Sequence, residues 1–132
     1  MSSDFKELLK IFNDNGVRYL VIGGYAVLRY SEPRFTKDLD LWISVDAANA
    51  TAVFRSLRQF GAPLVGTTEN DFAEEGFFYQ LGIPPARDDI LMSIPGIEFE
   101  QAWVCRETAD FDCVAALFIS KDTGNKTGIK AP

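Results

Sequence analysis

Two aspartates, Asp38 and Asp40, stand two residues apart in the segment DLDLWIS, residues 38–44. Polar and apolar residues alternate along this segment, which predicts a half-buried strand that carries both carboxylates on one face. Carboxylates this close repel each other unless a cation, a proton or solvent offsets their charge. Mg²⁺ is suited to that task because it binds oxygen ligands. The alternative interpretation is the solvated face of an edge strand, which produces the same alternation without any ligand.

A pair of glycines, Gly23 and Gly24, precedes the two aspartates by thirteen intervening residues. The segment 18–22 before them predicts a strand, and residues 25–28 after them indicate the start of a helix. A glycine turn that opens a helix exposes backbone N–H groups and the positive end of the helix dipole, so a phosphate group fits there. A tight turn without a ligand is the other interpretation of two adjacent glycines.

The composition excludes several classes of chemistry. The chain has no histidine, so it has no Ser-His-Asp triad and no HExxH zinc site. Thirteen basic and nineteen acidic residues give a net charge of −6, which disfavours general binding to nucleic acid. Cys105 and Cys113 are too few for a disulfide scaffold, so we expect buried thiols in a reduced, cytoplasmic protein. The apolar runs are far shorter than the ~20 residues of a membrane span, and we expect no contact with a membrane.

Helical and strand periodicities alternate along the chain, which predicts an α/β or α+β domain. The helical signals include a capping box of Asp4 with Glu7, and an N-cap at Asp46 followed by an apolar stripe up to Gly61. The expected helices cover residues 4–16, 46–61, 69–75 and 97–103, and the expected strands cover residues 18–22, 38–44, 77–81, 88–92 and 113–119. We expect one domain, residues 1–120, and a polar tail, residues 121–132, with almost no apolar side chains to pack.

The glycine pair and the aspartate pair together resemble the signature of the nucleotidyltransferase superfamily with the DNA polymerase β-like palm. That signature is a glycine pair, a spacer, and two aspartates that alternate with apolar residues. More closely, residues 22–27 (IGGYAV) and 33–41 (PRFTKDLDL) are similar to the small bacterial group that includes the AbiEii-type toxins and related uncharacterised nucleotidyltransferases. The likeness continues through residues 85–91, 94–99 and 102–103, and covers roughly residues 5–120.

The resemblance implies an α+β (α/β-like) nucleotidyltransferase fold, in which helices pack on a mixed β-sheet. It also implies that Asp38 and Asp40 bind two Mg²⁺ or Mn²⁺ ions together with a third carboxylate on a neighbouring strand. Asp88 and Asp89 are adjacent and therefore alternate between the two faces of their strand. We choose Asp89 because it comes directly before an Ile-Leu pair, as in the pattern of the family, while Asp88 remains the alternative.

By the same resemblance, Gly23 and Gly24 hold the triphosphate of a nucleotide. Lys37 and Arg34 would neutralise phosphate charge, and Thr36 would supply a hydroxyl group. Solvated loop charges are the alternative for the two basic residues. Tyr25 is a candidate for stacking on a base or ribose, although an aromatic residue at a helix start is more often packed in the core. We expect packing also for Trp42, which shares the strand face of the aspartates.

The function that the resemblance implies is metal-dependent transfer of a nucleoside monophosphate from an NTP to an acceptor hydroxyl, with release of pyrophosphate. The acceptor would be an RNA end such as that of tRNA, a protein side chain or a small molecule. Relatives usually continue past the last strand with a basic helix, whereas residues 121–132 lack helical periodicity. The alternative is therefore a catalytically degenerate module that binds a nucleotide or a partner, of an antitoxin-like or regulatory kind. A third interpretation of the short C-terminal part is a transferase whose site is completed by a second subunit, either in a homodimer or from a different partner.

Overall fold

The computed structural model describes residues 3–22, 38–76, 78–81, 87–94, 96–111 and 114–120. The helices in this part of the chain are α1 (Ser3–Asp14), α3 (Ala47–Phe60), the 3₁₀ helix η2 (Glu69–Ala73) and α4 (Phe99–Val104). The strands are β1 (Tyr19–Ile22), β2 (Asp38–Ile43), β3 (Phe78–Leu81), β4 (Arg87–Leu91), β5 (Glu107–Phe111) and β6 (Val114–Phe118). The expected helix start at residues 25–28 and the expected polar tail lie outside the described residues.

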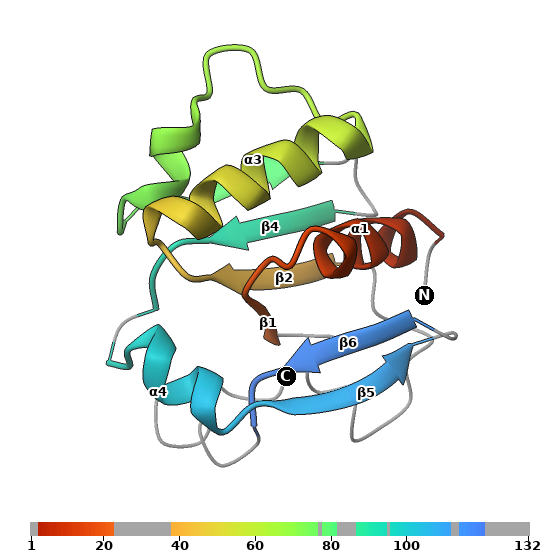
Figure 1. Ribbon diagram of the computed structural model, residues 1–132, viewed down its shortest axis with the longest axis vertical. Helices are drawn as coiled ribbons and strands as arrows, with labels where there is room; N and C mark the ends of the chain where they lie inside the picture. The colour runs from red at the N-terminus through yellow and green to blue at the C-terminus, as the bar shows by residue number, and fades with distance from the viewer. Residues whose placement is uncertain are drawn as a thin grey trace.

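The strands form one six-stranded sheet in the order β3-β4-β2-β1-β6-β5, and Figure 1 shows β4, β2, β1, β6 and β5 in this order from top to bottom. The central pair, β1 and β2, is antiparallel, while β2 pairs with β4 and β1 pairs with β6 in parallel. The outer pairs, β3 with β4 and β5 with β6, are antiparallel. The fold is therefore α+β with a mixed sheet, as the sequence predicted.

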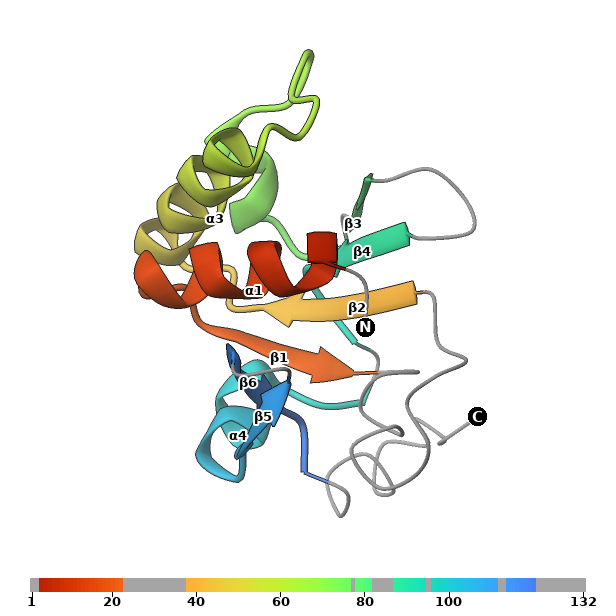
Figure 2. The same ribbon diagram turned by 90° about the vertical axis from the view of Figure 1, so that its right-hand side faces the viewer.

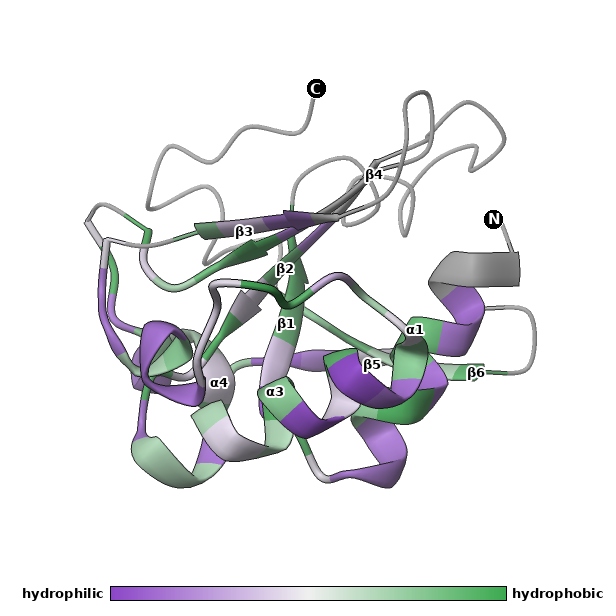
Figure 3. Cartoon of the chain, turned by 90° about the horizontal axis from the view of Figure 1, so that it is seen from above, coloured by the Kyte–Doolittle hydropathy of each residue, from purple (hydrophilic) through white to green (hydrophobic). Residues whose placement is uncertain are grey.

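Two helices, α1 and α3, cover one face of this sheet. Figure 1 shows both in front of the strands, and the turned view in Figure 2 shows both on the same side of β3 and β4. Hydrophilic and hydrophobic residues alternate along these helices (Figure 3), as expected for helices that bury one side against a sheet. The ring of Phe12 on α1 lies 5.7 Å from that of Tyr19 on β1, and Phe72 of η2 packs between Phe54 and Tyr79.

The sequence signals for α3 are confirmed at both ends of the helix. The Asp46 side chain accepts a hydrogen bond of 2.8 Å from the backbone N–H of Asn49, which satisfies a donor that the first turn leaves unpaired. This hydrogen bond, together with one from the Ser44 hydroxyl and the nearby charge of Arg18, lowers the pKa of Asp46 below its ordinary value. Gly61 ends the helix in the left-handed conformation, with φ of 93°.

The sequence patterns missed one strand, and one expectation is wrong. They assigned no element to residues 104–112, yet β5 runs along the sheet edge there as the antiparallel partner of β6. Its sequence, ETADF, has little apolar character because an edge strand packs few side chains into the core. We also expected Cys105 to be buried, but it caps the C-terminal end of the short helix α4 and is exposed. Cys113 lies outside the described residues.

No helix in the described ranges is long and apolar enough to cross a membrane.

Candidate functional site

Asp40 and Asp89 lie directly opposite each other on two neighbouring parallel strands. The register of β2 and β4 pairs Asp40 with Asp89, and the next pair is Leu41 with Ile90. Leu41 and Ile90 are fully buried in the hydrophobic core, whereas Asp40 and Asp89 are only half-buried. Side chains alternate between the faces of a strand, so both carboxylates project from the sheet face opposite to the core that α1 and α3 cover.

The same register separates the two candidates for the third carboxylate. Asp89 is the partner of Asp40, while Asp88 is the partner of Leu39. The adjacency of Asp89 to Asp40 comes from the pairing of β2 with β4, since the two residues are far apart in the sequence.

Gln80 is a residue of this site that the sequence analysis missed. It lies on β3 as the antiparallel partner of Asp89, and its Nε2 donates a hydrogen bond of 3.0 Å to Oδ1 of Asp89. A row of polar side chains thus crosses three strands, from Gln80 through Asp89 to Asp40. The alternation of the segment FYQL would have put Gln80 on one face, but only the strand order brings it beside an aspartate.

The other predicted site residues are described in part or not at all. Asp38 is the first residue of β2 and pairs with Arg87, but its side chain lies outside the described ones. Ile22, which comes immediately before Gly23, is the register partner of Asp40, so β1 ends beside the two carboxylates. The remaining candidates lie outside the described residues: Gly23, Gly24, Tyr25, Arg34, Thr36 and Lys37.

Oxygen ligands are what this site offers to a metal ion. Asp40 and Asp89 supply two carboxylates on one face, and such oxygen donors suit Mg²⁺ or Mn²⁺. Among the side chains that the structure describes, no group of three or more His, Cys, Asp or Glu could hold a metal ion. A site of three carboxylates therefore requires the side chain of Asp38, two positions before Asp40 on the same strand. The chemistry of the donors fits the ions that the sequence motif implies.

Two residues after Asp40 on the same face of β2, the side chain is the aromatic ring of Trp42 and not a carboxylate. Trp42 lies between Leu20 on β1 and Leu91 on β4, and it is only 2% exposed. The ring of Phe99, at the start of α4, meets the Trp42 indole edge to face at a centroid distance of 5.1 Å. The expectation that Trp42 is packed is confirmed, and α4 is the element that covers it.

Side chains around α4 hold this helix in place. Phe99 stacks on Trp103 at 5.7 Å, and the guanidinium groups of Arg18 and Arg106 lie 4.9 Å and 4.0 Å from the centroid of the Trp103 ring. Arg18 also forms an ion pair of 2.7 Å with Glu100. The contacts of Arg18 tie α4 to the residue that precedes β1, so the helix that covers Trp42 is held against the sheet.

Comparison with known proteins adds no family. No protein-family model matches the chain, and no curated protein sequence matches it either. Function is therefore inferred from the motifs and from the geometry of the sheet.

Proposed function

We propose that this chain is a metal-dependent nucleotidyltransferase, which moves a nucleoside monophosphate from an NTP to an acceptor hydroxyl. The observation that carries the proposal is the pairing of Asp40 with Asp89 on parallel neighbouring strands, at the point where β1 ends and Gly23 and Gly24 follow. The mixed sheet, with α1 and α3 on one face and the carboxylate pair on the other, is compatible with the polymerase β-like palm.

Each carboxylate has a role in this proposal. In the reaction, the acceptor oxygen forms a bond to the α-phosphorus as the bond from that phosphorus to the β-phosphate oxygen breaks, and pyrophosphate leaves. Two bound Mg²⁺ or Mn²⁺ ions would supply charge stabilisation for the attacking and leaving oxygens. Asp38, Asp40 and Asp89 would hold them, and Asp89 would accept the proton of the acceptor hydroxyl. The hydrogen bond from Gln80 fixes one oxygen of Asp89 and so orients the other.

The residues between β1 and β2 would bind the triphosphate. Gly23 and Gly24 follow Ile22, whose partner is Asp40, so the phosphates would enter beside the carboxylates. Lys37 and Arg34 would neutralise phosphate charge, and Thr36 would donate its hydroxyl. Tyr25 would contact the base or ribose.

Nucleotide binding measured by calorimetry tests the proposal. Each of the four NTPs is titrated into the protein with Mg²⁺ or Mn²⁺, then with the metal chelated. Metal-dependent binding of at least one NTP is expected, and it should be lost in Asp40→Asn and in Asp89→Asn. The matched control is Asp110→Asn, which changes an exposed aspartate on the edge strand β5.

The outcomes separate the two functions that the sequence left open. Binding in the wild type and in Asp110→Asn, but in neither site variant, supports the transferase, and transfer of label from an α-labelled NTP then identifies the acceptor. If no NTP binds, or if the site variants bind as tightly as the wild type, the proposal is wrong. A degenerate module that binds a partner would then be the better account.

A further inference from the structure

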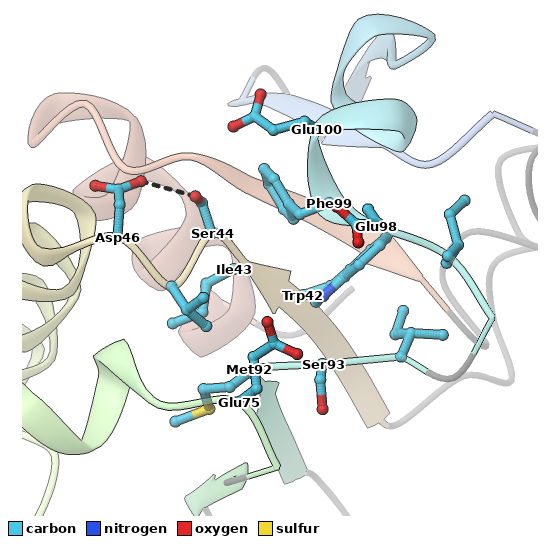
Figure 4. A pocket seen from close by; sticks show the side chains of 13 residues that line it. Trp42, Ile43, Ser44, Asp46, Glu75, Met92, Ser93, Glu98, Phe99 and Glu100 are labelled. Carbon is cyan, nitrogen blue, oxygen red and sulfur yellow. Dashed lines mark hydrogen bonds between the residues drawn. The ribbon is translucent and has the colours of Figure 1, made fainter.

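A pocket of about 350 Å³ lies at the carboxyl ends of β2 and β4 (Figure 4), and neither Asp40 nor Asp89 lines it. Thirteen residues line it, from β2, the start of α3, the segment after η2, the segment after β4 and the start of α4. Four of these residues are acidic, and neither Lys nor Arg is among them. A pocket of this size matches the volume that small-molecule ligands occupy in proteins.

Two of the four carboxylates already have partners. Asp46 accepts hydrogen bonds from the Asn49 backbone and from the Ser44 hydroxyl, and Glu100 is ion-paired with Arg18. The side-chain carboxylates of Glu75 and Glu98 have neither a hydrogen-bond partner nor an ion-pair partner among the described residues, and Glu98 accepts hydrogen bonds only through its backbone carbonyl. Glu98 precedes α4, but its side chain does not cap that helix. The pocket therefore has two carboxylates whose charge the described residues do not neutralise.

The indole N–H of Trp42 is a further polar group of the pocket that lacks a partner. This side chain is 2% exposed and lines the pocket, yet within the described part of the chain its N–H has no acceptor. Buried donors in folded proteins are nearly always paired, and leaving one unpaired is costly. Figure 4 shows the nitrogen-bearing end of the indole on the side of Glu75 and Ser93, within the ring of lining residues. An acceptor atom of a bound molecule would satisfy this donor.

We propose that this pocket binds a small organic cation that carries primary amino groups close to a hydroxyl or carbonyl oxygen. The amino groups donate to Glu75 and Glu98, and the oxygen accepts from the Trp42 indole. The aromatic ring of Phe99 and the apolar side chains of Met92 and Ile94 surround the carbon skeleton. These apolar neighbours are poor surroundings for a small metal ion, which requires several oxygen ligands.

This site does not depend on the nucleotidyltransferase proposal. It shares no residue with the set assigned above to metal and nucleotide, and its ligand differs in charge from an NTP. Failure of nucleotide binding therefore leaves the pocket proposal standing, and failure of cation binding leaves the transferase standing.

Nuclear magnetic resonance of the two tryptophan indole N–H groups tests the proposal directly. The chain has only Trp42 and Trp103, and a Trp103→Phe variant assigns the two signals. The probe is 1,3-diamino-2-propanol, which has two amino groups and one hydroxyl, and glycerol is its uncharged counterpart. The Trp42 signal should shift saturably with the diamine, while an equal concentration of glycerol should leave it in place.

Charge-neutralising variants identify the carboxylates. Glu98→Gln and Glu75→Gln should each weaken binding of the diamine by about tenfold, which is the loss of one charge-assisted hydrogen bond. Glu69→Gln, an exposed residue of η2 that does not line the pocket, should bind as the wild type. Equal shifts with glycerol, an unchanged affinity in both Glu98→Gln and Glu75→Gln, or a Trp42 shift with Mg²⁺ alone would each overturn the proposal.

Discussion

The two faces of the central sheet are made by neighbouring residues and have opposite characters. Leu41 and Ile90 project into a core that α1 and α3 cover, and both are 0% exposed. Asp40 and Asp89, one position earlier on the same strands, lie on the other face and are half-buried. Alternation along a strand thus divides two tasks: one face supplies the burial that stabilises the fold, and the other is free to carry charge.

The charged face is itself divided along its length. At the Asp40 end, three polar side chains lie in a row across β3, β4 and β2. Two residues further along, Trp42 is covered by Phe99 of α4, and the pocket with Glu75 and Glu98 begins there. The start of α4, together with the segments after β2, η2 and β4, therefore lines a cavity at this end of the sheet.

The largest expected effect comes from the charged face. Under the transferase proposal, nucleotidyl transfer in Asp40→Asn or Asp89→Asn should fall by about 100-fold or more, because the proposed roles of these carboxylates are metal ligand and proton acceptor. The free energy of unfolding should change by no more than about 1 kcal/mol, because one of two adjacent like charges is removed and the amide oxygen introduced by Asp89→Asn can still accept the hydrogen bond from Gln80. Transfer is measured with an α-labelled NTP, and unfolding with urea. A large loss of stability would show instead that the pair is structural.

The neighbouring residue on the other face should behave in the opposite way. Leu41→Ala should reduce the free energy of unfolding by about 2–5 kcal/mol, because it leaves a cavity in a fully buried position. Urea unfolding measures the loss. At a temperature where Leu41→Ala is still folded, this variant should, under the transferase proposal, bind nucleotide as the wild type does. If Leu41→Ala had a small effect on stability and Asp40→Asn a large one, the charged face and not the core face would be the one that stabilises the fold.

Tyr19 provides a smaller test on the core side. Its hydroxyl donates to Oδ1 of Asn13 at 2.9 Å and accepts from the backbone N–H of Leu117 at 3.3 Å, so it joins α1, β1 and β6. Tyr19→Phe should cost about 1 kcal/mol at neutral pH, measured by urea unfolding.

The same residue makes the stability of the core depend on pH in the alkaline range. Burial raises the pKa of Tyr19 from 10.0 to about 12, so the folded state favours the neutral phenol. That contribution is complete below pH 10 and is lost as the pH rises toward 12. The wild type should therefore lose stability relative to Tyr19→Phe across this range, and parallel curves for the two proteins would contradict the burial of the phenol.

The smallest effect is expected at Asp46, where the cap of α3 meets the rim of the pocket. Asp46→Ala should lower the free energy of unfolding by about 1 kcal/mol at pH 7 through loss of the cap. The pKa of Asp46 is lowered in the folded state, so the charged form stabilises the fold above the ordinary value of 3.8 and this contribution fades as the pH falls below it. Thermal unfolding should show that the difference in stability between the wild type and Asp46→Ala is smaller at pH 2 than at pH 7. Asp46→Asn keeps a capping oxygen, so its stability at pH 7 should stay close to that of the wild type.

Local signals predicted much of the fold. The Asp46 cap and the stop at Gly61 delimited α3, and the alternation in residues 38–44 identified β2. These elements were predictable because caps and periodicity lie within a few residues of each other. Strand β5 and the exposure of Cys105 were not, because an edge strand and the end of a short helix carry few apolar residues whose pattern could be read.

Individual residues of the candidate site could be predicted from the sequence, but the contacts between residues on different strands could not. The alternation of Asp38 and Asp40 was evident in the sequence, whereas Gln80 gave no sign of its contact with Asp89. The pocket beyond Trp42 was also hidden, since Glu75 and Glu98 come from segments that meet only when α4 packs on the sheet.

By itself, then, the sequence determined which residues alternate on β2, where α3 begins and ends, and how far the glycine pair lies from the aspartates, since all three depend on short-range spacing. Only the tertiary structure decided that Asp89, and not Asp88, is the neighbour of Asp40 and that Trp42 lies beneath Phe99. The physical reason is that strand register and helix docking are set by the burial of residues distant in the chain, such as Leu41 against Ile90, which no local pattern encodes.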